Sequence, residues 1–238
     1  MTVGPVTYLR SLIFVALFYL WSAVLAFVYA PLVLAPPLWM LAAFRGWTLG
    51  VFALLRICCG VRVELRGRPP EGAALIAAKH QCMFDVFAQF AWLPRNCFVM
   101  KKELLWIPFI GWYSRKTRMI VIDRAGGAQA LRDLIRVARA RFEEGRQVVI
   151  FPEGTRGAPG TTGAYQPGIA ALYRDLGAPV CPVATNSGAH WPAHGFLRKP
   201  GVIVFEYLEP IPPGLPRAEF MRRLQSAIEE ASTRLLAL

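Results

Sequence analysis

A long run without charged side chains occupies the N-terminal part of the sequence. It extends from Ser11 to Phe44. A helix of about 20 apolar residues is long enough to cross a bilayer. Three prolines, Pro31, Pro36 and Pro37, interrupt the run, so it does not form one straight helix. We therefore expect residues 1–60 to form an apolar membrane anchor of one or two helices.

A second apolar stretch follows from Leu38 to Gly60, and only Arg45 and Arg56 carry charge within it. Together the two stretches predict a helical hairpin. Either the first helix spans the bilayer, or both helices lie in one leaflet with these arginines reaching the headgroups. The sequence leaves both arrangements open. A cleaved signal peptide is disfavoured, because its apolar region is only about 7–15 residues long.

The remainder of the chain is strongly basic. The net charge is +12, and Arg10 is the only charged residue before Arg45. A basic excess favours an anionic partner, either nucleic acid or a membrane, and the apolar N-terminus favours the membrane. Membrane topology by itself also explains the excess of basic residues, because Lys and Arg accumulate on the cytoplasmic side of membrane proteins. Both interpretations put the body of the protein on the cytoplasmic face, which we expect to be that of the bacterial inner membrane.

The cysteines indicate a reducing compartment. Their number is odd and no C-x-x-C occurs, which is typical of thiols that pack as small hydrophobic groups. The His and Cys positions lack the spacing of zinc ligands, so we expect no metal site. The five cysteines are Cys58, Cys59, Cys82, Cys97 and Cys181.

From Val61 onward, short apolar runs alternate with stretches of helical period. This alternation predicts a catalytic domain over residues 61–238, with a mixed, largely parallel sheet covered by helices. We expect strands at 61–65, 73–78, 97–100, 119–122, 148–151, 180–183 and 202–207. We expect helices at 85–91, 126–144, 168–176 and 219–236.

The motif H-Q-C-M-F-D contains a histidine and an aspartate five residues apart, His80 and Asp85. Five residues of ideal helix put two side chains some 140° apart. Contact between the two therefore requires His80 in the loop after its strand and Asp85 near the start of the next helix. In that arrangement the carboxylate orients the imidazole, which then acts as a general base on a substrate hydroxyl. Taken alone, this pair also fits an ordinary loop histidine beside an unrelated aspartate.

A second motif, F-P-E-G-T-R at 151–156, follows another apolar strand. Thr155 offers a hydroxyl and Arg156 a guanidinium fork, and both groups suit phosphate. An ordinary turn with a surface ion pair is the alternative for this motif alone.

Two further strands are followed by cations. One ends at Lys101 and Lys102, and the other at Arg124 in the sequence I-D-R. If these strands are parallel, their ends lie near the ends of the strands that precede His80 and the 151–156 motif. Convergent cations beside a general base suit a phosphorylated substrate.

Taken together, these motifs resemble one family, the 1-acylglycerol-3-phosphate (lysophosphatidic acid) acyltransferases. Four signatures occur in the family's order, and the resemblance covers roughly residues 61–212. They are H-Q-C-M-F-D (80–85), I-D-R (122–124), F-P-E-G-T-R (151–156) and V-C-P-V (180–183). The segment K-K-E-L-L-W-I-P-F-I-G (101–111) is also similar to one in that family.

The resemblance implies transfer of an acyl chain from acyl-CoA or acyl carrier protein to the 2-hydroxyl of lysophosphatidic acid, giving phosphatidic acid. It implies no cofactor beyond the donor and no nucleic-acid partner. It assigns the base to His80 and its orientation to Asp85. Phosphate binding falls to Arg124 and Arg156, assisted by Lys101. The acceptor site is shaped by Glu153 and Gly154, and Pro182 lines the apolar region near the acyl chain.

One position departs from the family. Related sequences often have a lysine where this chain has Gln166, which cannot supply charge. Two other functions remain as alternatives: an acyltransferase for another lyso-lipid, such as lyso-ornithine lipid, and a non-catalytic, membrane-attached lipid-binding protein. The aromatic segment from Trp106 to Tyr113 is expected either to line an acyl tunnel, to enter the membrane interface, or to pack as core. His190 and His194 are expected to be loop residues without a catalytic role.

Overall fold

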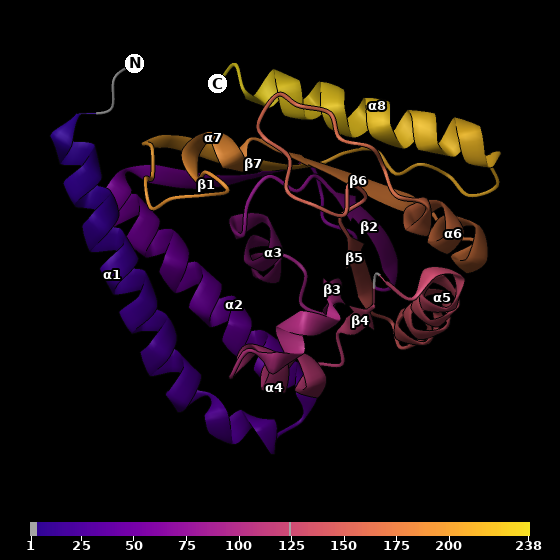
Figure 1. Ribbon diagram of the computed structural model, residues 1–238, viewed down its shortest axis with the longest axis horizontal. Coiled ribbons are helices and arrows are strands. Elements are labelled where there is room, and N and C mark those ends of the chain that lie inside the picture. Colours follow the sequence, from indigo (N-terminus) through magenta and orange to yellow (C-terminus); the bar gives the residue numbers. More distant parts are fainter. Residues whose placement is uncertain (1–3, 124) are drawn as a thin grey trace.

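The computed structural model describes residues 4–123 and 125–238. It shows a seven-stranded sheet with helices on both faces, preceded by a helical hairpin (Figure 1). The strands are β1 (Val61–Arg66), β2 (Ala74–Ala78), β3 (Asn96–Lys101), β4 (Ile120–Ile122), β5 (Gln147–Ile150), β6 (Val180–Thr185) and β7 (Gly201–Tyr207). The α-helices are α1 (Pro5–Val28), α2 (Pro37–Leu54), α3 (Phe84–Ala88), α4 (Ile110–Lys116), α5 (Gly127–Glu143), α6 (Pro167–Leu176), α7 (Ser187–His190) and α8 (Arg217–Leu235). Shorter helical turns are η1 (Ala30–Val33), η2 (Leu55–Cys59), η3 (Gln89–Ala91) and η4 (Lys102–Trp106).

The strands are ordered β1-β7-β6-β2-β5-β3-β4. All neighbouring pairs are parallel except β6 and β7, which are antiparallel. The predicted mixed, largely parallel sheet is therefore confirmed. Strand β2 lies at the centre, and every one of its residues is buried. A central parallel strand is covered on both faces, which explains why Ala74–Ala78 is apolar throughout rather than alternating.

Two apolar layers pack against the two faces of the sheet. Leu75 and Ala77 of β2 belong to the layer beneath α5, α6 and α8. Ile76 and Ala78 point to the opposite face and join a layer with α1, α2 and α3. This division follows from the two-residue period of a strand, in which successive side chains point to opposite faces.

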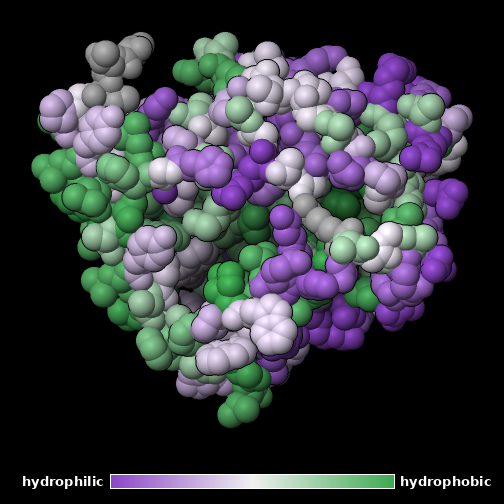
Figure 2. Space-filling model, viewed as in Figure 1, coloured by the Kyte–Doolittle hydropathy of each residue, from purple (hydrophilic) through white to green (hydrophobic). Residues whose placement is uncertain are grey.

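The predicted hairpin is formed by α1 and α2. Trp21 Nε1 donates a hydrogen bond to the carbonyl oxygen of Trp47 at 3.2 Å, and this bond joins the two helices. The inward residues Phe14 and Phe18 of α1 contact Trp191 of the catalytic domain. Many outward apolar side chains stay exposed, and they colour the left side of the surface in Figure 2 green. Both Pro5–Val28 and Pro37–Cys59 are long and apolar enough to cross a membrane.

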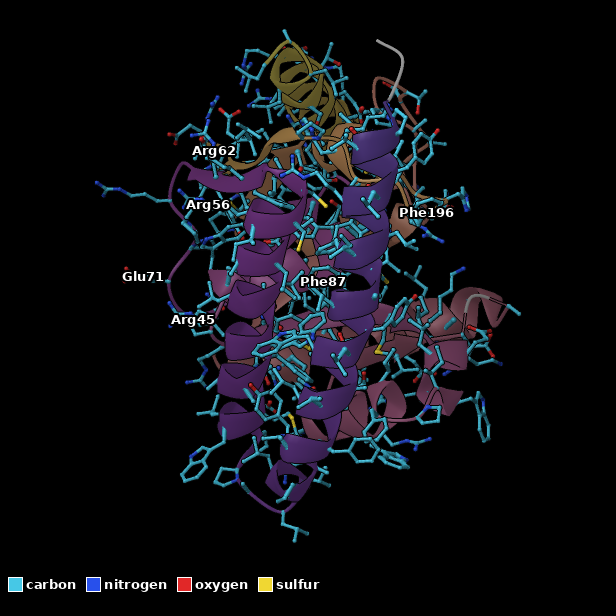
Figure 3. All side chains as sticks on the ribbon, turned by 90° about the vertical axis from the view of Figure 1, so that its left-hand side faces the viewer. Arg45, Arg56, Arg62, Glu71, Phe87 and Phe196 are labelled. Atoms are coloured by element: carbon cyan, nitrogen blue, oxygen red, sulfur yellow. The ribbon has the colours of Figure 1, made fainter. Side chains whose placement is uncertain are left out.

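Figure 3 shows Arg45, Arg56 and Arg62 along the α2 side of the hairpin. Arg45 does not project freely from it, because its Nε donates to the carbonyl oxygen of Ala91 at 3.1 Å. The hairpin also shares an apolar layer with the sheet. The predicted division of the chain at residue 60 stays a prediction.

Candidate active site

Four adjacent parallel strands, β2, β5, β3 and β4, end along the same edge of the sheet. In open α/β sheets this edge is where ligands bind. The surface is hollowed in the region where Figure 1 shows α3, with apolar residues on the α1 side and hydrophilic residues opposite (Figure 2). The residues at or just after these strand ends are His80, the 151–156 motif, Lys101 and Asp123.

The structure brings His80 and Asp85 into contact. The Nδ1 atom of His80 lies 3.3 Å from Oδ2 of Asp85. As the spacing requires, His80 is in the loop after β2 and Asp85 is in the first turn of α3. A carboxylate only accepts hydrogen bonds, so the ring nitrogen that faces it carries the proton. The lone pair is then on Nε2, which is the nitrogen that can abstract a proton from a substrate.

Asp85 is completely buried and is held by several donors. Its Oδ2 accepts the backbone N–H groups of Gln81 at 2.5 Å and Cys82 at 2.8 Å. Its Oδ1 accepts the hydroxyl of Ser187, at the start of α7. Hydrogen bonds of this kind satisfy a carboxylate that has no contact with water. The side chain of His80 is 16% exposed and stacks on Phe151, with ring centroids 4.3 Å apart.

The 151–156 motif is bonded to the loop of His80. Gly154 adopts a φ of 66°, which favours glycine, and its N–H donates to the Phe151 carbonyl oxygen at 3.0 Å. The turn directs Glu153 inward, where Oε1 accepts the N–H of His80 at 3.3 Å. The N–H of Gly157 donates to the carbonyl oxygen of His80 at 2.8 Å. Both backbone polar groups of His80 are therefore bonded to this turn.

Glu153 does not face the solvent-filled edge of the sheet. It is 3% exposed, and its Oε2 lies 3.2 Å from Nζ of Lys79. Burial raises the pKa of the Glu153 carboxyl, and the neighbouring ammonium lowers it again in part. Any influence of Glu153 on the acceptor site is therefore indirect and acts through the loop of His80.

The predicted phosphate ligands differ in their surroundings. Arg156 is exposed, and its Nη1 donates to the carbonyl oxygen of Ala193 at 3.2 Å. Thr155 and Lys101 are also exposed. Lys102 is paired with Asp123. Of the two lysines at the end of β3, Lys101 is therefore the one that can bind a ligand. Arg124 lies outside the described residues.

Two other predicted positions lie farther from the loop edge. Pro182 is buried in the middle of β6, opposite Ala77 of β2. Gln166 directly precedes α6, and its N–H donates to the carbonyl oxygen of Pro152 at 2.8 Å. Among the described residues, no group of three or more His, Cys, Asp or Glu is placed to hold a metal ion.

The match to known proteins covers this edge. The sequence model of the family described as Acyltransferase matches residues 60–186. The 1-acyl-sn-glycerol-3-phosphate acyltransferase of Pseudomonas aeruginosa is 36% identical over 195 residues, which cover 79% of this chain and 76% of that protein. The chain belongs to the 1-acyl-sn-glycerol-3-phosphate acyltransferase family. All the residues proposed from the sequence fall within the range 60–186.

Another relative and a solved structure are also similar to this chain. The protein of the same name from Helicobacter pylori is 40% identical over 102 residues, covering 42% of this chain and 43% of that protein. The fold matches the crystal structure of the 1-acyl-sn-glycerophosphate (LPA) acyltransferase PlsC from Thermotoga maritima. The TM-score is 0.80 with 23% identity, and the match covers 98% of both chains. The N-terminal hairpin is thus part of the shared fold.

Sequence reasoning missed three side chains at the site. Ser187 bonds Asp85, and the buried Lys79, which precedes His80, forms an ion pair with the partly buried Glu229. Of the three, only Lys79 could have been found from the sequence. A lysine directly after an apolar central strand must lie either in the interior or at the edge where the strand ends. Ser187 and Glu229 are more than 100 residues away from their partners, and no local pattern connects them.

Proposed function

We propose that this protein transfers a fatty acyl chain from acyl-CoA or acyl carrier protein to the 2-hydroxyl of lysophosphatidic acid, giving phosphatidic acid. The His80–Asp85 pair, at an edge of the sheet that also bears exposed cations, is the observation that carries the proposal. The names of the relatives from Pseudomonas aeruginosa and Helicobacter pylori support the choice of acceptor. The reaction needs no cofactor besides the donor.

In this mechanism Nε2 of His80 takes the proton of the acceptor hydroxyl as its oxygen attacks the thioester carbonyl carbon. The negative charge of Asp85 stabilises the imidazolium that forms. The tetrahedral intermediate collapses with cleavage of the carbon–sulfur bond, and the imidazolium returns its proton to the leaving thiolate. No nucleophile of the protein is acylated, because the substrate supplies the attacking oxygen.

The acceptor phosphate is proposed to be held by Arg156 and Arg124, with Lys101 assisting. A guanidinium binds phosphate through two parallel hydrogen bonds, which also orients the glycerol backbone. The apolar hairpin is proposed to hold the enzyme in the membrane, with the catalytic domain on the cytoplasmic face. A lipid acceptor then reaches the site without leaving the bilayer.

The test is an assay of membranes containing the protein, with a labelled thioester donor and a panel of lyso-lipid acceptors. We expect labelled product from lysophosphatidic acid. We expect His80→Ala to abolish it while the protein stays in the membrane fraction. His194→Ala is the matched control, since His194 is an exposed loop residue, and it should retain full activity. Labelling of lyso-ornithine lipid instead would move the assignment to the other acceptor, and turnover by His80→Ala would refute the base.

A further inference from the structure

Lys79 has a buried ammonium group for which the acyl-transfer mechanism has no use. The residue is 1% exposed although it directly follows β2. Its Nζ lies 3.2 Å from Oε2 of Glu153, 2.8 and 2.9 Å from the two oxygens of Glu229, and 3.0 Å from the carbonyl oxygen of Thr161. An ammonium has three protons to donate, and these acceptors use all of them. Lys79 therefore has no donor left for a substrate phosphate.

The ammonium joins three segments that are far apart in the sequence. Lys79 begins the loop of His80, Glu153 and Thr161 belong to the loop after β5, and Glu229 projects from α8. The hydroxyl of Tyr165 adds a fourth contact by donating to Oε1 of Glu229 at 2.9 Å. Figure 1 shows the loop after β5 running alongside α8. A buried charge whose partners lie in two other segments fixes the three segments relative to one another, because movement of any one would leave a charge unpaired.

This cluster lies directly behind the proposed base. The carboxylate of Glu153 contacts Lys79 through one oxygen and accepts the backbone N–H of His80 through the other. The next turn of the same loop bonds the carbonyl of His80 through Gly157. A methyl group at Gly157 would lie 2.8 Å from Oε2 of Glu153, so the loop is packed tightly around the carboxylate. The position of His80 thus depends on where Glu153 is held.

We propose that Lys79 and Glu229 are positioning residues for the acyl transfer. Their ion pair, in which Lys79 is fully buried and Glu229 largely so, fixes Glu153 and the loop that carries Arg156 against the backbone of His80, and it links Glu229 of α8 to that loop. The inference rests on the proposed function of His80. Lys79 uses its three donors within the cluster and Glu229 is an anion, so neither side chain is suited to bind a phosphate, and their effect is on the placement of the base and not on substrate affinity.

The experiment compares Glu229→Gln with Glu230→Gln in the full-length protein. Gln keeps the size of the side chain and removes its charge. Glu230 is the matched control, because it lies next to Glu229 on α8 but is exposed, and its carboxylate accepts a hydrogen bond from Ser226 of the same helix. For each variant, kcat and KM for lysophosphatidic acid are measured per folded enzyme, and the thermal midpoint is recorded.

We expect Glu229→Gln to lower kcat by about 10- to 100-fold, the effect of a misplacement of roughly 1 Å in a catalytic group. KM for lysophosphatidic acid should change by less than about twofold, since no substrate contact is lost. Glu230→Gln should match the wild type. A kcat of Glu229→Gln within twofold of the wild type would overturn the proposal. A loss of activity that equals the loss of folded enzyme would overturn it too.

A second variant covers a possible failure of Glu229→Gln to fold. Lys79→Met combined with Glu153→Gln and Glu229→Gln removes the ammonium and both carboxylates, so that no charge is left buried without a partner. The triple variant should fold and still show the low kcat, and a wild-type kcat would refute the positioning role. If the wild type itself transfers no acyl group to lysophosphatidic acid, the proposed function is refuted, and the positioning role is refuted with it.

Discussion

Asp85→Asn tests the charge of the buried carboxylate separately from its hydrogen bonds. Oδ2 of Asp85 faces three N–H groups, those of His80, Gln81 and Cys82, and Oδ1 faces the hydroxyl of Ser187. In the Asp85→Asn variant, the side-chain oxygen must take the position of Oδ2, because the three donors there need an acceptor. The amide NH₂ then faces Ser187, whose oxygen can accept. We therefore expect the variant to keep the fold and the imidazole tautomer while it loses the negative charge.

The size of the effect follows from the distance between the two groups. Unit charges 3.3 Å apart attract each other by about 5 kcal/mol at an effective dielectric constant of about 20. If half of the proton charge has reached the imidazole in the transition state, the loss is about 2.5 kcal/mol, or roughly 70-fold in kcat. With the proton fully transferred, the loss is about 5 kcal/mol, or roughly 5000-fold.

The measurement is kcat with saturating thioester donor, together with the thermal midpoint of the purified variant. Asp85→Ala is the comparison, because it leaves the buried N–H groups without an acceptor. Each such group costs about 1–3 kcal/mol, so this variant should also lose stability. If Asp85→Asn folds normally and retains kcat within about fivefold of the wild type, the carboxylate does not stabilise an imidazolium and the reasoning is wrong.

Two other predictions concern the phosphate and the thiols. Arg156→Ala should raise KM for lysophosphatidic acid by roughly 10- to 100-fold, the value of a lost charge-assisted contact, and unchanged KM and kcat would remove Arg156 from the site. Iodoacetamide at neutral pH should leave Cys97 and Cys181 of the folded enzyme unlabelled. Burial raises the pKa of Cys97 to about 11 and that of Cys181 to about 12, so neither thiol ionises at neutral pH. Labelling of either thiol in the folded enzyme would contradict this.

The strands were predictable because each of them has a strong local pattern. All seven expected strands are present, and their bounds differ from the prediction by one or two residues at most. Helix α5 follows from the helical period of its apolar residues. The antiparallel pairing of β7 with β6 was not predictable, because strand direction depends on the path of the connecting loop. The residues of that connection, 186–200, have no simple pattern.

The site was predictable only where its partners are close in the sequence. His80 and Asp85 are five residues apart, so the length of the loop limits how they meet. The cluster of Lys79, Glu153 and Glu229 is assembled by the tertiary fold across 150 residues. The sequence interpretation made Glu153 a residue that shapes the acceptor site, whereas the structure buries it behind the loop of His80.

The arrangement explains in physical terms why the H-Q-C-M-F-D and F-P-E-G-T-R motifs function together. An imidazole base must be fixed at both its ring and its backbone, because freedom at either one moves Nε2 relative to the substrate. Asp85 fixes the ring through Nδ1. Glu153 and Gly157 fix the backbone through the N–H and the carbonyl of His80. Two carboxylates from different motifs thus hold one residue from opposite ends, and only that of Asp85 contacts the ring.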